Sequence, residues 1–151
     1  VNLSSETTLR LAEDFENIVA IKEASGNLAQ INEIISHAPA GFEVISGDDS
    51  LTFEIVALGC VGVISVVANA FPNEMAELVR SMKNGDVFEA LHIHRAFHDI
   101  FRLAFVEGNP AGVKCMMAER KELQNILRLP LTEVSENTRR HIAQALQDFE
   151  I

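Results

Sequence analysis

The sequence is poor in cationic residues. It has 12 lysine and arginine residues against 22 aspartate and glutamate residues, which gives a net charge of -10 over 151 residues. Binding to nucleic acid or to an anionic membrane surface requires clustered lysine and arginine side chains, and the sequence has no such cluster. We therefore expect neither a nucleic-acid partner nor a membrane partner.

Long apolar runs are absent and cysteine is scarce. No stretch is long and apolar enough for a transmembrane helix, and no basic start is followed by an apolar middle as in a signal peptide. The two cysteines, Cys60 and Cys115, have no CxxC spacing and lie in apolar or helical surroundings. We expect them to be buried free thiols, and we expect a cytoplasmic protein.

Motifs for phosphate and metal binding are also missing. The sequence contains neither a P-loop nor a G-x-G-x-x-G segment. His94 and His98 are four residues apart on a predicted helix, but they lack a neighbouring HExxH glutamate and a third ligand. Asp48 and Asp49 lack the spaced oxygens of a calcium loop. We expect no metal site.

The sequence does contain an alternation of short apolar runs and helical patterns. Apolar runs near residues 17–22, 42–46 and 62–67 predict strands, and the segments between them predict helices, the first with Asn27 as its N-cap. Each connection is too long for a hairpin, which favours a parallel sheet. The pattern after residue 70 is helical, with Pro72 in the first turn of a predicted helix and Gly85 just after its end. A long helix is predicted over residues 86–105, and a last helix is capped by Ser135.

Lys22 stands at the end of the first predicted strand, where an ammonium group is costly to bury. Ligands of α/β proteins bind at the carboxyl ends of strands. Partial burial would lower the pKa of this lysine, and the neutral amine could then attack a carbonyl and form a Schiff base. The alternative is a lysine that reaches solvent or pairs with Glu23. Small and polar residues follow the second strand, namely Ser46, Gly47 and Asp48.

Residues 21–27, IKEASGN, resemble the Schiff-base lysine motif of the dihydrodipicolinate synthase and N-acetylneuraminate lyase superfamily. The segments SGDD at 46–49 and GVISV at 62–66 resemble the next two strands of that superfamily, in the same order. FVEGNP at 105–110 and LRLPL at 127–131 resemble the C-terminal helical extension of its dihydrodipicolinate synthase branch. The resemblance covers nearly the whole chain.

The resemblance implies an α/β fold that is the C-terminal half of a TIM (β/α)₈ barrel. Strands six to eight would lie within residues 1–70, and the last barrel helix and the helical extension within residues 71–151. The family's first five strands have no counterpart here, nor do the tyrosines of its proton relay, since the sequence contains no tyrosine. Positioned acid–base groups typically supply about 10² to 10⁴ in rate, so we expect the isolated chain to be weakly active or inactive.

The resemblance also implies a lyase of the class I aldolase type, which condenses pyruvate with L-aspartate 4-semialdehyde in lysine and diaminopimelate biosynthesis. Lys22 would form the imine with pyruvate, without a further cofactor. Ile64 would provide a main-chain carbonyl near the pyruvate, and Gly47 would line the pocket, with smaller contributions from Ser46 and Asp48. The parent enzyme would be a homo-oligomer, a tetramer or a dimer.

Two alternatives remain open. The first is another pyruvate-dependent aldolase of the same superfamily, acting on a sialic acid or on a 2-keto-3-deoxy sugar acid. The second is a non-catalytic assembly fragment. Its exposed sheet edges would be covered by self-association or by the missing half-barrel, because edge strands present unpaired backbone groups.

Overall fold

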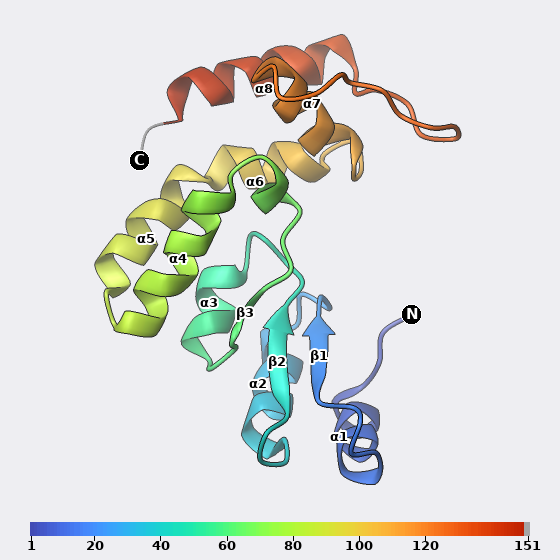
Figure 1. Cartoon of the computed structure of the whole chain (residues 1–151), viewed down its shortest axis with the longest axis vertical. Coiled ribbons are helices and arrows are strands. Elements are labelled where there is room, and N and C mark those ends of the chain that lie inside the picture. Colours follow the sequence, from blue (N-terminus) through green and yellow to red (C-terminus); the bar gives the residue numbers. More distant parts are fainter. Residues whose placement is uncertain (150–151) are drawn as a thin grey trace. The chain divides into compact units, whose positions relative to one another are not determined.

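The computed structural model describes residues 1–149, and the chain divides into two compact units, Val1–Ser65 and Val66–Ile151 (Figure 1). The first unit contains a parallel sheet of three strands in the order β1-β2-β3. The strands are β1 (Ala20–Glu23), β2 (Glu43–Ser46) and β3 (Gly62–Val63). The α/β class and the parallel arrangement predicted from the sequence are confirmed. Because the strands are parallel, their carboxyl ends lie at one edge of the sheet.

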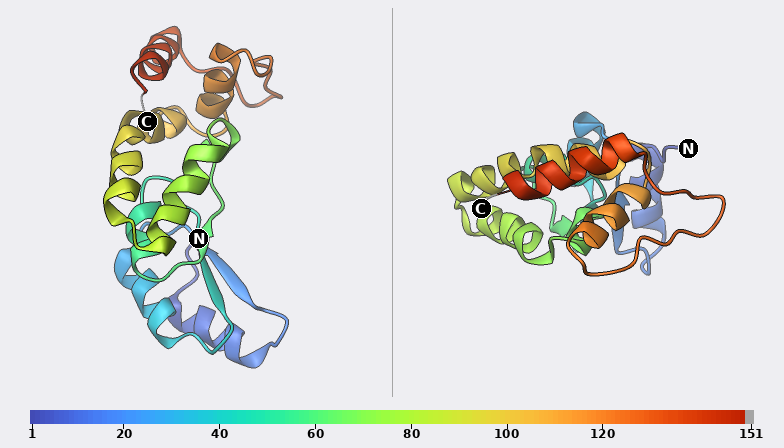
Figure 2. Two further views of the ribbon diagram at one scale, coloured as in Figure 1. Left: turned by 60° about the vertical axis from the view of Figure 1, so that its left-hand side comes forward. Right: turned by 90° about the horizontal axis from the view of Figure 1, so that it is seen from above.

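Three helices accompany the sheet in this unit: α1 (Ser5–Asp14), α2 (Leu28–His37) and α3 (Thr52–Ala57). Asn27 caps α2 as predicted, because its side chain accepts hydrogen bonds from the N–H groups of Ala29 and Gln30. Helices α2 and α3 contact the sheet and lie on the same side of it (Figure 2). The core between them is made of fully or nearly fully buried aliphatic side chains, namely Ile31, Ile34, Val44 and Ile55.

The two faces of the sheet differ in exposure. Side chains alternate between the faces along a strand. Val44 and Ser46 of β2 point toward the helices and are buried, whereas Ile45 between them is only half-buried. On the face of Ile45, Lys22 is exposed and Ile64, just beyond β3, keeps 50% of its surface accessible. The first unit thus has one covered and one open sheet face.

The second unit is helical in the residues that the structure describes. Pro72 stands in the first turn of its first long helix and Gly85 follows that helix with a φ of 84°, as the sequence predicts for the two ends of a helix. Ser135 caps the last helix, also as predicted, by accepting a hydrogen bond from the Thr138 N–H. The elements are η1 (Val67–Asn69), α4 (Pro72–Asn84), α5 (Val87–Ala96), α6 (His98–Phe105), α7 (Ala111–Glu119) and α8 (Glu136–Asp148).

Several predicted elements differ in extent from the structure. The continuous helix predicted over residues 86–105 is wrong, because the chain forms α5 and α6 with a break at Phe97. The Phe97 ring is fully buried and packs against Phe71 and Phe101, at centroid distances of 5.4 and 5.1 Å. The helix thus breaks where Phe97 makes its tertiary contacts, and residues 86–105 contain no glycine or proline that would signal a break. Strand β3 ends at Val63, although the apolar run predicts a strand over residues 62–67, and Val67 belongs to η1. Strand β1 spans Ala20–Glu23 where the sequence predicts a strand near residues 17–22.

Both cysteines are free and buried, as predicted, with 3% of Cys60 and 1% of Cys115 exposed. Burial raises the pKa of both thiols, so they remain protonated at neutral pH. Within residues 1–149, no helix has both the length and the apolar character that crossing a membrane requires.

Candidate functional site

The register of the sheet places three of the predicted site residues on its open face. Lys22 pairs with Ile45, and Ile45 pairs with Gly62. Gly47 and Ile64 each follow one of these partners by two residues and therefore face the same side as Lys22. The sheet thus brings Lys22, Gly47 and Ile64 together at its carboxyl edge.

Backbone hydrogen bonds extend this pairing beyond the ends of the strands. The Gly47 N–H donates to the Glu23 carbonyl at 2.8 Å, and the Ile64 N–H donates to the Ser46 carbonyl at 2.8 Å. The main chain at Gly47 and Ile64 is therefore held in line with the sheet.

Gly47 lies directly beneath the side chain of Lys22. A Cβ atom at Gly47 would be 2.8 Å from Lys22 Cε, 3.0 Å from Lys22 Cγ and 2.8 Å from the Cβ of Ala24. Contacts this short do not occur between real carbon atoms, so any larger residue would push the lysine away. The absence of a side chain at Gly47 allows Lys22 to lie across the end of β2.

Ser46 and Asp48 are engaged within the turn between β2 and α3. Ser46 is fully buried, and its hydroxyl donates to the Asp48 carbonyl at 3.0 Å while accepting from the Asp48 N–H at 3.2 Å. One carboxylate oxygen of Asp48 accepts from the N–H and the hydroxyl of Ser50, at 3.0 and 2.8 Å. These contacts shape the turn, and none of them involves Lys22. The predicted contribution of both residues to a pocket stays a prediction.

Asp49 joins the same turn to the end of β3. Its side chain is 1% exposed and accepts a hydrogen bond from the hydroxyl of Ser65, the residue after Ile64. The sequence pattern does not reveal this contact, because the two residues are 16 positions apart and no local motif links them. Within residues 1–149, no three His, Cys, Asp or Glu side chains gather as metal ligands.

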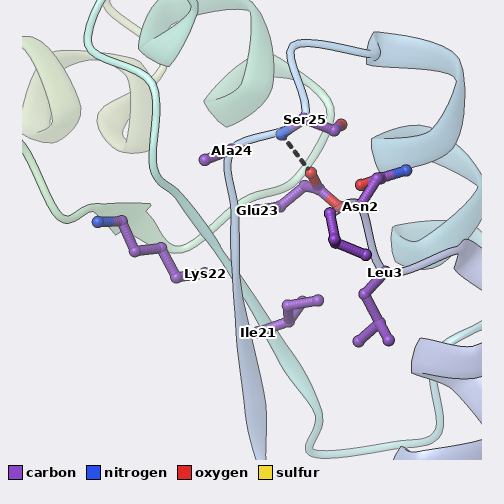
Figure 3. A pocket seen from close by; sticks show the side chains of 8 residues that line it. Asn2, Leu3, Ile21, Lys22, Glu23, Ala24 and Ser25 are labelled. Carbon is purple, nitrogen blue, oxygen red and sulfur yellow. Dashed lines mark hydrogen bonds between the residues drawn. The ribbon is translucent and has the colours of Figure 1, made fainter.

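Glu23 points to the opposite side of β1 from Lys22 (Figure 3). Its Oε1 accepts from the Ser25 N–H at 2.7 Å, and its Oε2 accepts from Gln30 Nε2 at 2.9 Å. The sequence alternative in which Glu23 pairs with Lys22 is therefore wrong. Lys22 itself is exposed, which agrees with the alternative in which the lysine reaches solvent and not with the partial burial invoked for a reactive amine.

A groove of about 530 Å³ runs beside β1, the outer strand of the sheet. It lies between the strand and the first residues of the chain, and in Figure 3 Ile21 and Glu23 face Asn2 and Leu3 there. The residues that line it are Val1, Asn2, Leu3, Ile21, Lys22, Glu23, Ala24 and Ser25. The groove follows an edge that is open to further pairing.

Comparison with known proteins gives consistent results for sequence and structure. The chain is 51% identical over 151 residues to the 4-hydroxy-tetrahydrodipicolinate synthase of Phocaeicola vulgatus, which covers 100% of this chain and 51% of that protein. The crystal structure of dihydrodipicolinate synthase from Aquifex aeolicus matches with a TM-score of 0.94 and 41% identity, over 99% of this chain and 51% of that one. The chain spans about half the length of the curated relatives that it matches.

A further structural match comes from a chloride-inhibited dihydrodipicolinate synthase of Acinetobacter baumannii, which was solved in complex with pyruvate. Its TM-score is 0.93 and its identity 35%, over 98% of this chain and 50% of that one. The sequence model of the Dihydrodipicolinate synthetase family matches residues 1–149. The resemblance inferred from the lysine motif is confirmed: the chain belongs to the dihydrodipicolinate synthetase family.

Proposed function

We propose that this chain carries the Schiff-base lysine of a pyruvate-dependent lyase, and that Lys22 is this lysine. The observation that carries the proposal is the position of the Lys22 side chain, which lies across Gly47 at the carboxyl ends of the parallel strands. Ligands bind at this edge in α/β folds. The pyruvate complex of the Acinetobacter baumannii relative supports the choice of substrate.

We further propose that the chain is the C-terminal half of a (β/α)₈ barrel followed by a helical extension. The open sheet face supports this, because in a closed barrel that face would be interior and Ile64 and Lys22 would be covered. The outer positions of β1 and β3 support it too, since a barrel pairs every strand on both sides. Covering by the remaining strands would then supply the partial burial that Lys22 lacks here.

The proposed reaction begins at the Lys22 amine. The amine attacks the C2 carbonyl of pyruvate, and loss of water gives an iminium ion that draws electrons from the adjacent carbon. Loss of a C3 proton gives an enamine, and this carbon then attacks the aldehyde carbon of L-aspartate 4-semialdehyde to form the new C–C bond. The amino group of the added unit displaces Lys22 from C2, which frees the lysine. The Ile64 main chain and Gly47 would border the pyruvate.

The experiment that tests the proposal is intact-mass analysis after incubation with pyruvate and borohydride, followed by peptide mapping. We expect one reduced pyruvate adduct, on Lys22. Lys22→Ala should abolish it, whereas Lys83→Ala, which removes an exposed lysine of α4, should leave it unchanged. An adduct that persists in Lys22→Ala would show that another group is the nucleophile. A folded chain that forms no adduct would contradict the proposal for this chain alone.

The second substrate separates the synthase from its aldolase relatives. The curated relatives cited above carry the synthase name, which supports L-aspartate 4-semialdehyde. Incubating the chain with pyruvate and without borohydride, adding this aldehyde or a sugar aldehyde, and measuring with which of them pyruvate is consumed would decide between them. Preference for the sugar aldehyde would contradict the synthase proposal.

A further inference from the structure

We propose that Glu23 is a positioning residue for Lys22, which acts through the turn that follows β1. The proposal rests on the proposed function, because it concerns the reactivity of the Schiff-base lysine. It assigns a role to a carboxylate that lies on the other side of the strand from the reacting amine (Figure 3).

The Glu23 carboxylate is buried and held by two uncharged donors. Only 3% of the residue is exposed, and its two oxygens accept from the Ser25 N–H and from Gln30 Nε2, at 2.7 and 2.9 Å. Burying a carboxylate is costly unless hydrogen bonds compensate. An apolar side chain here would incur no such cost, and the two hydrogen bonds compensate the carboxylate for its burial.

Gln30 links this carboxylate to the beginning of the chain. Its Nε2 also donates to the Leu3 carbonyl at 3.2 Å, and its Oε1 accepts from Asn2 Nδ2 at 2.7 Å. Glu23 and Gln30 therefore join the end of β1, the first turn of α2 and the segment at residues 2–3. A change in either side chain loosens all three at once.

The main chain of Glu23 connects these side-chain contacts to the site of the lysine. The Glu23 carbonyl accepts from the Gly47 N–H at 2.8 Å. The neighbours of Glu23 on either side, Lys22 and Ala24, both lie within 3 Å of the position of a Cβ on Gly47. Fixing residues 23–25 therefore fixes both the lysine and the small side chain that borders it. A displacement of about 1 Å from such a position can cost about 10²-fold in rate.

The test measures borohydride trapping of pyruvate per folded molecule in three variants. Glu23→Gln keeps the size of the side chain, but an NH₂ group replaces one of the two accepting oxygens, so one of the two donors loses its acceptor. We expect trapping to fall at least about tenfold in Glu23→Gln and further in Glu23→Ala. The matched control is Glu33→Gln, a glutamate of α2 whose carboxylate accepts from the Ser5 hydroxyl of α1 at 2.7 Å. We expect it to trap at the wild-type rate.

A purely structural role would lower the Tm of the Glu23 variants without changing trapping per folded molecule, and that result would overturn the inference. Amide hydrogen exchange at Gly47 gives a second reading that needs no pyruvate. It should speed up more in Glu23→Gln than in Glu33→Gln, and equal exchange in the two variants would equally overturn the inference. Absence of any adduct in the wild-type chain would instead count against the proposed function, with Gly47 exchange still deciding the role of Glu23.

Discussion

At the scale of single residues, the absence of a side chain at Gly47 leaves the space that the Lys22 side chain occupies. The side chain crosses Gly47 with carbon atoms so close that a methyl group has no room. Of the three nearest atoms, two belong to the flexible lysine and one to Ala24, whose Cβ moves only with the main chain. A methyl group at position 47 would therefore displace the lysine first.

Gly47→Ala should consequently impair the lysine more than the fold. We expect pyruvate trapping to fall by about 10-fold to 100-fold, and the free energy of unfolding to fall by about 1–3 kcal/mol from overpacking. Gly62→Ala is the matched control, because a Cβ there meets no atom within 4 Å. Intact-mass trapping rates and thermal melts measure both effects. Wild-type trapping in Gly47→Ala would show that the position of the lysine over Gly47 does not matter.

Sequence reasoning identified the lysine and the glycine, but not the residues that anchor them. Lys22 and Gly47 follow apolar runs directly, so a local pattern predicts their place at a strand end. Glu23 gained no such signal, because its partner Gln30 belongs to the next helix and is itself tied to residues 2–3. The buried state of Ser46 was also unpredictable, since the internal contacts of its hydroxyl depend on how the β2–α3 turn closes.

At the scale of elements, the start of α8 is attached to the end of α6 through one carboxylate. Glu107 accepts hydrogen bonds from the Ser135 N–H and hydroxyl, at 2.8 and 2.6 Å, and from the Thr138 hydroxyl. These hydrogen bonds lower the pKa of Glu107. The largest effect comes from the Ser135 hydroxyl, followed by the Thr138 hydroxyl and then the Ser135 N–H. The beginning of α8 is therefore held by a carboxylate that lies 28 positions before Ser135 in the sequence.

Because of this contact, we predict that the free energy of unfolding depends on pH. Because the folded-state pKa of Glu107 is lowered, its contribution is fully present above the unfolded-state value, which the reference of 4.5 represents, and is lost as pH falls through the folded pKa. Glu107→Gln should lower the Tm by a few degrees at pH 7. The difference from the wild type should shrink as the pH falls below about 4.

Thermal melts from pH 7 to pH 3 measure this difference. Glu13→Gln, a change to an exposed glutamate of α1, is the control and should give a small Tm difference. A Glu107→Gln difference that stays constant over this pH range would show that the charge of Glu107 does not contribute.

Elements with local signals were predicted best. The caps at Asn27 and Ser135 and the stop at Gly85 each depend on one residue and its immediate neighbours, and all three are confirmed. The break at Phe97 depends on rings from Phe71 and Phe101, and a helical period of apolar residues continues straight through it. Local sequence patterns thus predicted where helices end, whereas the break between α5 and α6 depends on tertiary packing.

At the scale of the whole molecule, the first unit carries surface that an α/β fold normally covers. The sheet has only three strands, its outer strands are β1 and β3, and one of its faces is open. Val19 next to β1 is 61% exposed and Ile64 is 50% exposed. The chain also spans about half the length of its curated relatives. These facts together favour a second polypeptide segment, of about this length, as the natural cover.

Supplying that segment in trans should therefore restore what the chain lacks. A separate polypeptide corresponding to the unmatched half of the Phocaeicola vulgatus relative should bind this chain one to one in size-exclusion chromatography. The mixture should consume pyruvate and L-aspartate 4-semialdehyde, and a mixture made with Lys22→Ala should bind equally well without turnover. The physical reason is that both open edges and the open face become covered at once, which orders Lys22 in a closed site. A chain that stays a stable monomer and ignores the added half would show that its exposed sheet needs no cover, and would contradict the half-barrel proposal.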